Sequence, residues 1–249
     1  EKTPGRRMAV SSSARRFHVG LVSATQFDDV SCWRGTLVPA AGELNARFGS
    51  IGLSRRSGVS EPTDLEKCAR DRLQRARRRV RHFVVSNGLS HHVTLTFASQ
   101  PESGLVAGSL VGRFFRRVRH RFSRVPFVWT LEYGSRRGRV HAHALLGALD
   151  EGVLDSLWGL GRTNHQFVGG DAEALRAAAG YLVKDLDRSP LQGGQAYRVA
   201  KGFQPDGVSL SGLQDPLSVI SEASYLMNAD PTSVDDLARG ASLTAFWDV

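Results

Sequence analysis

The chain has 249 residues, of which 41% are hydrophobic, enough to build one sizeable folded domain together with extensions. It contains no apolar run of about 18 residues, which argues against a membrane-spanning segment, and its two cysteines are too few for a disulfide scaffold. Lysine and arginine number 33 against 24 acidic residues, a net charge of +9. Because most of the positive side chains are arginines, which bind phosphate through paired hydrogen bonds, nucleic acid is the favoured partner.

The first part of the chain, residues 1–61, is rich in Gly, Ser, Ala and Arg and has no sustained hydrophobic period. This composition predicts a flexible or loosely folded extension. Thr63 and Glu66 then form a capping-box pattern, which predicts the start of a helix that runs to about Val85. The helix is rich in arginine. Its expected DNA contacts are Arg75, Arg78 and Arg79.

Residues 92–97 alternate between apolar and polar side chains, as a strand with one buried face does. Residues 105–123 carry apolar side chains at helical spacing, with arginines on both sides of the apolar stripe. We expect Arg116 and Arg117 of this second helix to contact DNA, although a solvated helix face explains them equally well.

A hairpin is predicted next, because two strand patterns at 127–133 and 139–147 flank the turn residues Gly134 to Gly138. The turn and the start of the second strand supply three more expected DNA contacts. These are Arg136, Arg137 and Arg139.

The remaining elements are a helix at 150–158, a strand at 162–168, a helix from Asp171 to about Asp187 and a strand at 195–203. This order predicts an α+β fold: an antiparallel sheet of about five strands with helices mainly on one face, within a domain at 62–204. Residues 205–249 form a C-terminal extension with a weaker pattern, in which a helix is expected near 231–239. The chain has no P-loop motif for nucleotide-driven DNA unwinding.

Two histidines on the second hairpin strand are the first candidates for chemistry. His141 and His143 are two residues apart, so both imidazoles point to one side of a strand and can reach one metal ion. A two-residue turn would pair Glu132 with His141 and add a carboxylate to the same face. A three- or five-residue turn would put Glu132 on the other face. Two imidazoles and one carboxylate suit a divalent catalytic ion.

Tyr181 and Lys184 are the candidates on the last long helix. Tyr181 lies off the apolar stripe of this helix, and Lys184 follows about one turn later. Ala177 and Gly180 beside them are small, which leaves room for a substrate.

Taken in order, the Thr-rich strand at 93–97, the His-hydrophobic-His strand at 141–143 and the Tyr-x-x-Lys helix at 181–184 resemble the HUH endonuclease superfamily. The likeness covers roughly residues 88–204, and it favours the replication initiators of rolling-circle plasmids, phages and single-stranded DNA viruses. No second tyrosine lies four or five residues from Tyr181, so the chain resembles the single-tyrosine branch.

The resemblance implies a mechanism in which a divalent ion, Mn²⁺ or Mg²⁺, is held by His141, His143 and Glu132. Tyr181 would attack the scissile phosphate of single-stranded origin DNA, leaving a 5′-phosphotyrosine and a free 3′-hydroxyl, and the strand would later be rejoined. Lys184 would favour the ionised phenol or hold the phosphate. The expected setting is the cytoplasm of a bacterial host, on a plasmid or phage, with a separate host helicase and no membrane.

Several alternatives remain open. A relaxase or a single-tyrosine transposase would share the same active site, and a non-catalytic single-strand binder would use the arginines alone. A nucleotide hydrolase with a His-x-His-x-His triad is disfavoured because position 145 is Leu. The other histidines, His91, His92 and His165, are expected on the surface or near DNA, with His165 a weak candidate for a metal neighbour.

Overall fold

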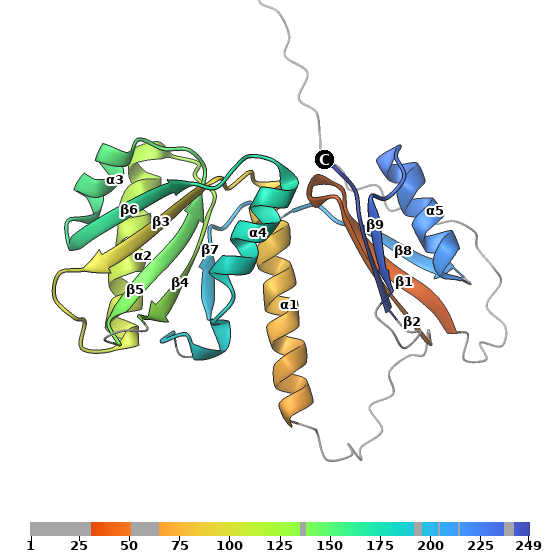
Figure 1. The fold of residues 1–249 in the computed structure, drawn as a ribbon, viewed down its shortest axis with the longest axis horizontal. Coiled ribbons are helices and arrows are strands. Elements are labelled where there is room, and N and C mark those ends of the chain that lie inside the picture. The colour runs from red at the N-terminus through yellow and green to blue at the C-terminus, as the bar shows by residue number, and fades with distance from the viewer. Residues whose placement is uncertain are drawn as a thin grey trace, which may run out of the picture.

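The computed structural model describes residues 31–50, 65–134, 138–191, 196–203, 205–213, 215–236 and 242–249. Over these residues the chain forms two five-stranded antiparallel sheets with five α-helices, an α+β fold (Figure 1). The expected fold class and an antiparallel five-stranded sheet are therefore confirmed, whereas the second sheet was not expected. No helix in the described ranges is both long enough and apolar enough to cross a membrane.

The sheet that carries the predicted motifs is called here the histidine sheet, and its strands run in the order β6-β3-β5-β4-β7. Its strands are β3 (His91–Phe97), β4 (Phe127–Tyr133), β5 (Val140–Leu146), β6 (Gly161–Phe167) and β7 (Tyr197–Val199). Every neighbouring pair is antiparallel. Side chains two apart in a strand therefore share a face, and one face of the sheet is apolar while the centre of the other is polar.

Helices lie on both faces of the histidine sheet. On the apolar face, α2 (Gly104–Phe122) and α3 (Glu151–Trp158) bury aromatic side chains, and Trp158 packs against Phe97 and Phe114. On the polar face lie α4 (Ala172–Leu182) and α1 (Leu65–Ser86), as the view in Figure 1 shows. The N-caps of α3 and α4 are the aspartates expected from the sequence, whereas Thr63, expected to cap α1, is outside the described residues.

The second sheet, called here the outer sheet, joins strands from both ends of the chain in the order β8-β1-β2-β10-β9. Its strands are β1 (Ser31–Val38), β2 (Glu43–Ser50), β8 (Val208–Leu213), β9 (Ser233–Asp236) and β10 (Ser242–Phe246). One face packs on α5 (Pro216–Met227) through a separate apolar cluster that contains Trp33, Leu44 and Val219.

Two expectations need correction here. Within 1–61, for which the sequence indicated a loosely folded extension, Ser31 to Ser50 form β1 and β2. The helix expected near 231–239 is wrong, because Ser233–Asp236 is the edge strand β9 and the helix of this region is α5. Both errors have one cause. These strands pair only with partners that are distant in sequence, so neither end of the chain carries a self-contained hydrophobic pattern.

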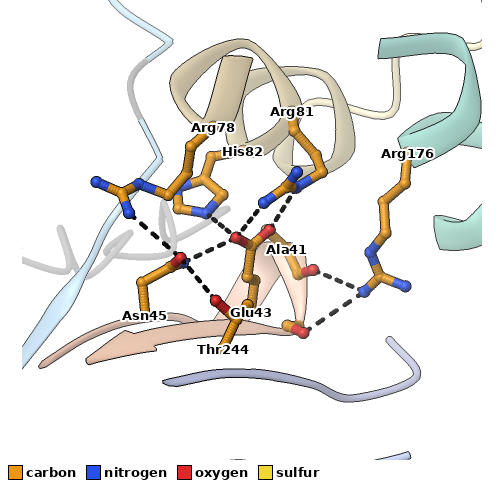
Figure 2. Close-up of polar contacts among 9 residues, drawn as sticks. Ala41, Glu43, Asn45, Arg78, Arg81, His82, Arg176 and Thr244 are labelled. Carbon is orange, nitrogen blue, oxygen red and sulfur yellow. Dashed lines mark hydrogen bonds and ion pairs between the residues drawn. The ribbon is translucent and has the colours of Figure 1, made fainter. Parts of the chain in front are cut away.

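The β1–β2 connection fits closely against the rest of the molecule. Gly42, which follows the short 3₁₀ turn Pro39–Ala41, has a φ of 55°, and a Cβ there would lie 2.3 Å from the carbonyl oxygen of Trp247. Arg176 on α4 donates to the carbonyl oxygens of Ala41 at 3.0 Å and Trp247 at 3.1 Å. The helix α4 is thereby tied to the outer sheet (Figure 2).

A buried carboxylate makes the second connection between the two sheets. The side chain of Glu43 on β2 is 1% exposed and accepts two hydrogen bonds from Arg81 on α1, at 2.6 and 2.7 Å. His82 Nε2 lies 3.1 Å from the same carboxylate, and Asn45 donates to it at 2.8 Å (Figure 2). Burial alone would raise the pKa of Glu43, but the hydrogen bonds and charges of Arg81 and His82 outweigh it and lower the pKa to about 2.

We predict that Glu43→Gln destabilises the protein at neutral pH, because Arg81 and His82 lose their anionic partner. A pKa lowered from 4.5 to about 2 corresponds to about 3 kcal/mol of folding free energy. This contribution is complete above pH 4.5 and is lost as the pH falls towards 2, since the folded state then takes up the proton. Urea unfolding across this pH range should show the gap between wild type and variant closing.

The matched control is Asp235→Asn, which neutralises an exposed carboxylate of the same sheet. It should change the free energy of unfolding little. A gap between wild type and Glu43→Gln that stays constant from neutral to acid pH would contradict the assigned role of Glu43.

Candidate active site

The hairpin of β4 and β5 has the register expected for a three-residue site. Glu132 pairs with His141 and Thr130 pairs with His143, so the three ligand candidates share the polar face of the histidine sheet. Gly134 donates its backbone N–H to the carbonyl oxygen of Arg139 at 2.9 Å and closes the hairpin. Residues 135–137 of the turn lie outside the described residues.

The donor atoms of this triad are close enough to hold one ion. One nitrogen or oxygen atom from each of Glu132, His141 and His143 lies within 4.8 Å of the other two. Glu132 Oε2 is 3.3 Å from His143 Nε2. Two imidazoles and a carboxylate on one strand pair form a donor set that divalent catalytic ions accept.

Hydrogen bonds also orient the two imidazoles. His141 Nδ1 lies 3.3 Å from the carbonyl oxygen of Arg139, which can only accept, so the proton belongs on Nδ1. His143 Nδ1 lies 3.2 Å from both Thr94 Oγ1 and His92 Nε2. With both Nδ1 atoms as donors, both Nε2 lone pairs are available to a cation. The residues present therefore fit a bound divalent ion.

His143 is the electrostatic centre of the site. It is 7% exposed. Burial and then the nearby His141, His92 and Lys184 disfavour its protonated form and lower its pKa to about 3. His143 is thus neutral at physiological pH, the form that binds metal ions, and its contact with Glu132 is not an ion pair.

His92 is a site residue that the sequence reasoning placed on the surface. Its ring stacks on His143 with centroids 5.2 Å apart, and burial lowers its pKa. The available signal was its parity with Thr94 in β3, but the sequence does not show that β3 lies next to β5. His165 pairs with Val93 and lies on the opposite face, 2.7 Å from Asp155, so it is not a metal neighbour.

Tyr181 stands beside the triad at the end of α4. It is 50% exposed, and its ring meets His92 and His143 edge-on at centroid distances of 5.8 and 5.9 Å. Lys184 lies just beyond the helix, with Nζ 4.2 Å from the centroid of the Tyr181 ring and 4.0 Å from Glu132 Oε1. All five predicted catalytic and metal-ligating residues are therefore gathered at one place.

A cleft of about 590 Å³ opens next to this cluster, between α4 and strands β3, β5 and β6. Its sheet side is polar, with Thr94, Asn164 and Gln166, and Phe167 at its rim is 66% exposed. Alanines on α4, among them Ala177, form the opposite wall and leave the space that the small residues of this helix predicted.

The arginines predicted to bind DNA are distributed over separate surfaces, and none of those described lines this cleft. Arg116 and Arg117 lie on α2, across the histidine sheet from the triad. Arg139 donates to the carbonyl oxygens of Phe97 and Ala98, a structural contact between β5 and the end of β3. Arg75, Arg78 and Arg79 line a groove between α1 and the outer sheet. Arg136 and Arg137 lie outside the described residues.

Comparison with known proteins gives one match. Residues 90–189 match a family model described as a replication-associated protein of the ORF2 type. No curated protein and no solved structure matches the chain. The matched segment contains Glu132, His141, His143, Tyr181 and Lys184 but neither α1 nor the outer sheet. The part of the chain that holds the candidate site thus resembles replication-associated proteins, which supports a role in DNA replication.

Proposed function

We propose that this chain is a metal-dependent endonuclease that nicks single-stranded origin DNA to start rolling-circle replication, with Tyr181 as its nucleophile. One observation carries the proposal: the ligand atoms of Glu132, His141 and His143 lie within 4.8 Å of one another, directly beside Tyr181 and Lys184. The match to replication-associated proteins supports the biological setting.

The triad would hold the ion through His141 Nε2, His143 Nε2 and a Glu132 oxygen. When bound, Mn²⁺ or Mg²⁺ supplies Lewis acidity and positive charge for a non-bridging oxygen of the scissile phosphate. The protein's own contribution is to keep both imidazoles neutral and oriented, through the carbonyl oxygen of Arg139 and the side chains of Thr94 and His92.

Tyr181 is placed to form the new bond. Its phenolic oxygen attacks phosphorus and the P–O3′ bond breaks, leaving a 5′-phosphotyrosine; the phenol loses its proton and the departing 3′ oxygen gains one. Because the phosphodiester energy is kept in the covalent link, reversal rejoins the strands without a nucleoside triphosphate. The Lys184 ammonium, 4.2 Å from the Tyr181 ring, lies where negative charge accumulates on the attacking and transferred groups.

The cleft beside Tyr181 suits the single strand that must lead into the site. The exposed ring of Phe167 offers a stacking surface for a base, and Asn164 and Gln166 offer amide groups to base edges. Because a base stacked within a duplex cannot reach such groups, the cleft favours unpaired DNA, and a separate helicase is expected to provide it.

We predict that Tyr181→Phe binds a single-stranded origin oligonucleotide as wild type does but forms no covalent adduct. The substitution keeps the ring against His92 and His143 and removes only the hydroxyl group. The measurement is a labelled oligonucleotide incubated with Mn²⁺ and run on a denaturing gel, with mass spectrometry to identify the modified peptide.

Tyr225→Phe is the matched control, since Tyr225 is 81% exposed on α5 and far along the chain. It should form the adduct normally. An adduct on Tyr197 or Tyr225, or an adduct in the Tyr181→Phe protein, would overturn the nucleophile. Wild-type protein that binds the oligonucleotide but never forms an adduct would favour a non-catalytic binder.

We predict that His141→Ala or His143→Ala abolishes metal-dependent cleavage, and that Glu132→Gln weakens the metal affinity. Losing one member of a three-residue donor set leaves too few ligands to hold the ion. Calorimetric titration with Mn²⁺ and cleavage assays with and without a chelator measure the two effects. His120→Ala, an exposed histidine on α2, should change neither. Undiminished cleavage by the double alanine variant would remove the metal site from the mechanism.

A further inference from the structure

A second polar surface exists outside the segment that matches replication-associated proteins. A groove of about 580 Å³ runs between α1 and the outer sheet. Thr36, Asn45, Ser242 and Thr244 line its sheet side. Five arginines complete the lining: Arg34 and Arg47 from the sheet, and Arg75, Arg78 and Arg79 from α1.

The strand register explains why these side chains share one face. Arg34 pairs with Arg47, and Asn45 pairs with Thr36 on one side and Thr244 on the other. Their neighbours in sequence point to the opposite face and form the apolar cluster under α5. The outer sheet thus has one face for its own core and one polar, arginine-bearing face that its own core does not require.

The charge of the groove is not balanced by its lining. Among the described lining residues there is no carboxylate. Glu43 at its inner end is buried and already bound by Arg81, His82 and Asn45 (Figure 2). On the neighbouring edge strand, Asp235 pairs with Thr244 but does not line the groove. The groove therefore presents an excess of positive charge.

The arginines are also close enough to affect one another. Arg78 donates to the neutral amide oxygen of Asn45 at 3.3 Å. Burial and the neighbouring charges of Arg81, Arg47 and Arg75 lower the pKa of Arg78, although Glu43 acts in the opposite direction. Like charges held this close repel, and a bound polyanion relieves the repulsion.

The lining indicates which polyanion fits. Arginine guanidinium groups with Ser, Thr and Asn side chains are the usual contacts to phosphate and sugar. Apart from the imidazole of His82, the described lining has no aromatic ring, whereas single-strand binders use such rings to stack unpaired bases. The chemistry of the groove thus matches a paired nucleic-acid backbone rather than unpaired bases.

The groove lies next to the candidate active site. Arg77 donates to the carbonyl oxygen of Lys184 at 3.2 Å, while the adjacent Arg78 contacts Asn45 in the groove. The two sites are therefore separated by about the width of one helix, roughly 10–12 Å. That spacing is comparable to about three base-pair steps of duplex DNA, at roughly 3.4 Å each.

We propose that the groove between α1 and the outer sheet binds the sugar–phosphate backbone of duplex DNA. If the proposed nicking function holds, on which this placement rests, the groove carries the duplex that flanks the nicked strand. Binding in the groove does not itself require the metal triad or Tyr181.

The test compares two triple variants that remove the same charge. Arg47→Gln, Arg75→Gln and Arg79→Gln change exposed groove arginines, and Arg113→Gln, Arg119→Gln and Arg121→Gln change exposed arginines on α2. Each is made in the Tyr181→Phe protein, which forms no adduct. Anisotropy of a labelled blunt-ended duplex of about two helical turns is titrated across a range of KCl concentrations, and circular dichroism checks the fold.

The groove variant should bind the duplex at least about tenfold more weakly than its parent at low salt, with a log–log salt slope smaller by about 3. The α2 variant should lose much less. Equal losses in both variants, or wild-type duplex binding by the groove variant, would overturn the proposal. A loss confined to single-stranded oligonucleotides would overturn the assignment to duplex. Since the readout is duplex affinity, failure of adduct formation by Tyr181 leaves this result separately interpretable.

Discussion

The buried pair of Glu43 and Arg81 is the contact on which the arrangement of the molecule depends. Glu43 belongs to the outer sheet and Arg81 to α1, and their two short hydrogen bonds lie almost wholly out of water. Separating them would leave a carboxylate without its partner in a site that is 1% exposed, at a cost of a few kcal/mol. The pair therefore fixes where α1 crosses the outer sheet, and the other side of α1 packs against α4. The position of Tyr181 relative to the outer sheet follows from this sequence of contacts.

Within the histidine sheet, strand parity is the constraint that builds the site. Glu132, His141 and His143 share a face because β4 and β5 are antiparallel in one particular register. A shift of one residue would turn Glu132 to the apolar face. The same alternation brings Thr94 and His92 against His143 from β3. The site thus combines a metal-ligating layer with a supporting layer that sets which nitrogen of each imidazole is free.

The local parts of this architecture could be predicted from the sequence, and the long-range parts could not. Strand alternation gave the face of His141 and His143, and helical spacing placed Tyr181 off the core of α4, because both patterns need only neighbouring residues. The position of His92 depends on which strand lies beside β5. The outer sheet depends on β1 and β2 finding β8 and β10 more than a hundred residues later, as their registers show. No local period encodes such pairing.

The uneven distribution of arginine also has a structural reason. On α1, Arg77 faces α4 and bonds to the backbone at Lys184, Arg81 is neutralised by Glu43, and Arg75 and Arg79 remain exposed toward the groove. One helix therefore uses arginines for two purposes, with those in ion pairs or backbone contacts holding the two sheets at a set distance. A molecule that must hold a cleaved strand and its neighbouring duplex together needs such a fixed spacing, since a displacement of about 1 Å at the reacting phosphate costs much of the rate. The buried ion pair on α1 supplies it without any direct contact to either site's ligand.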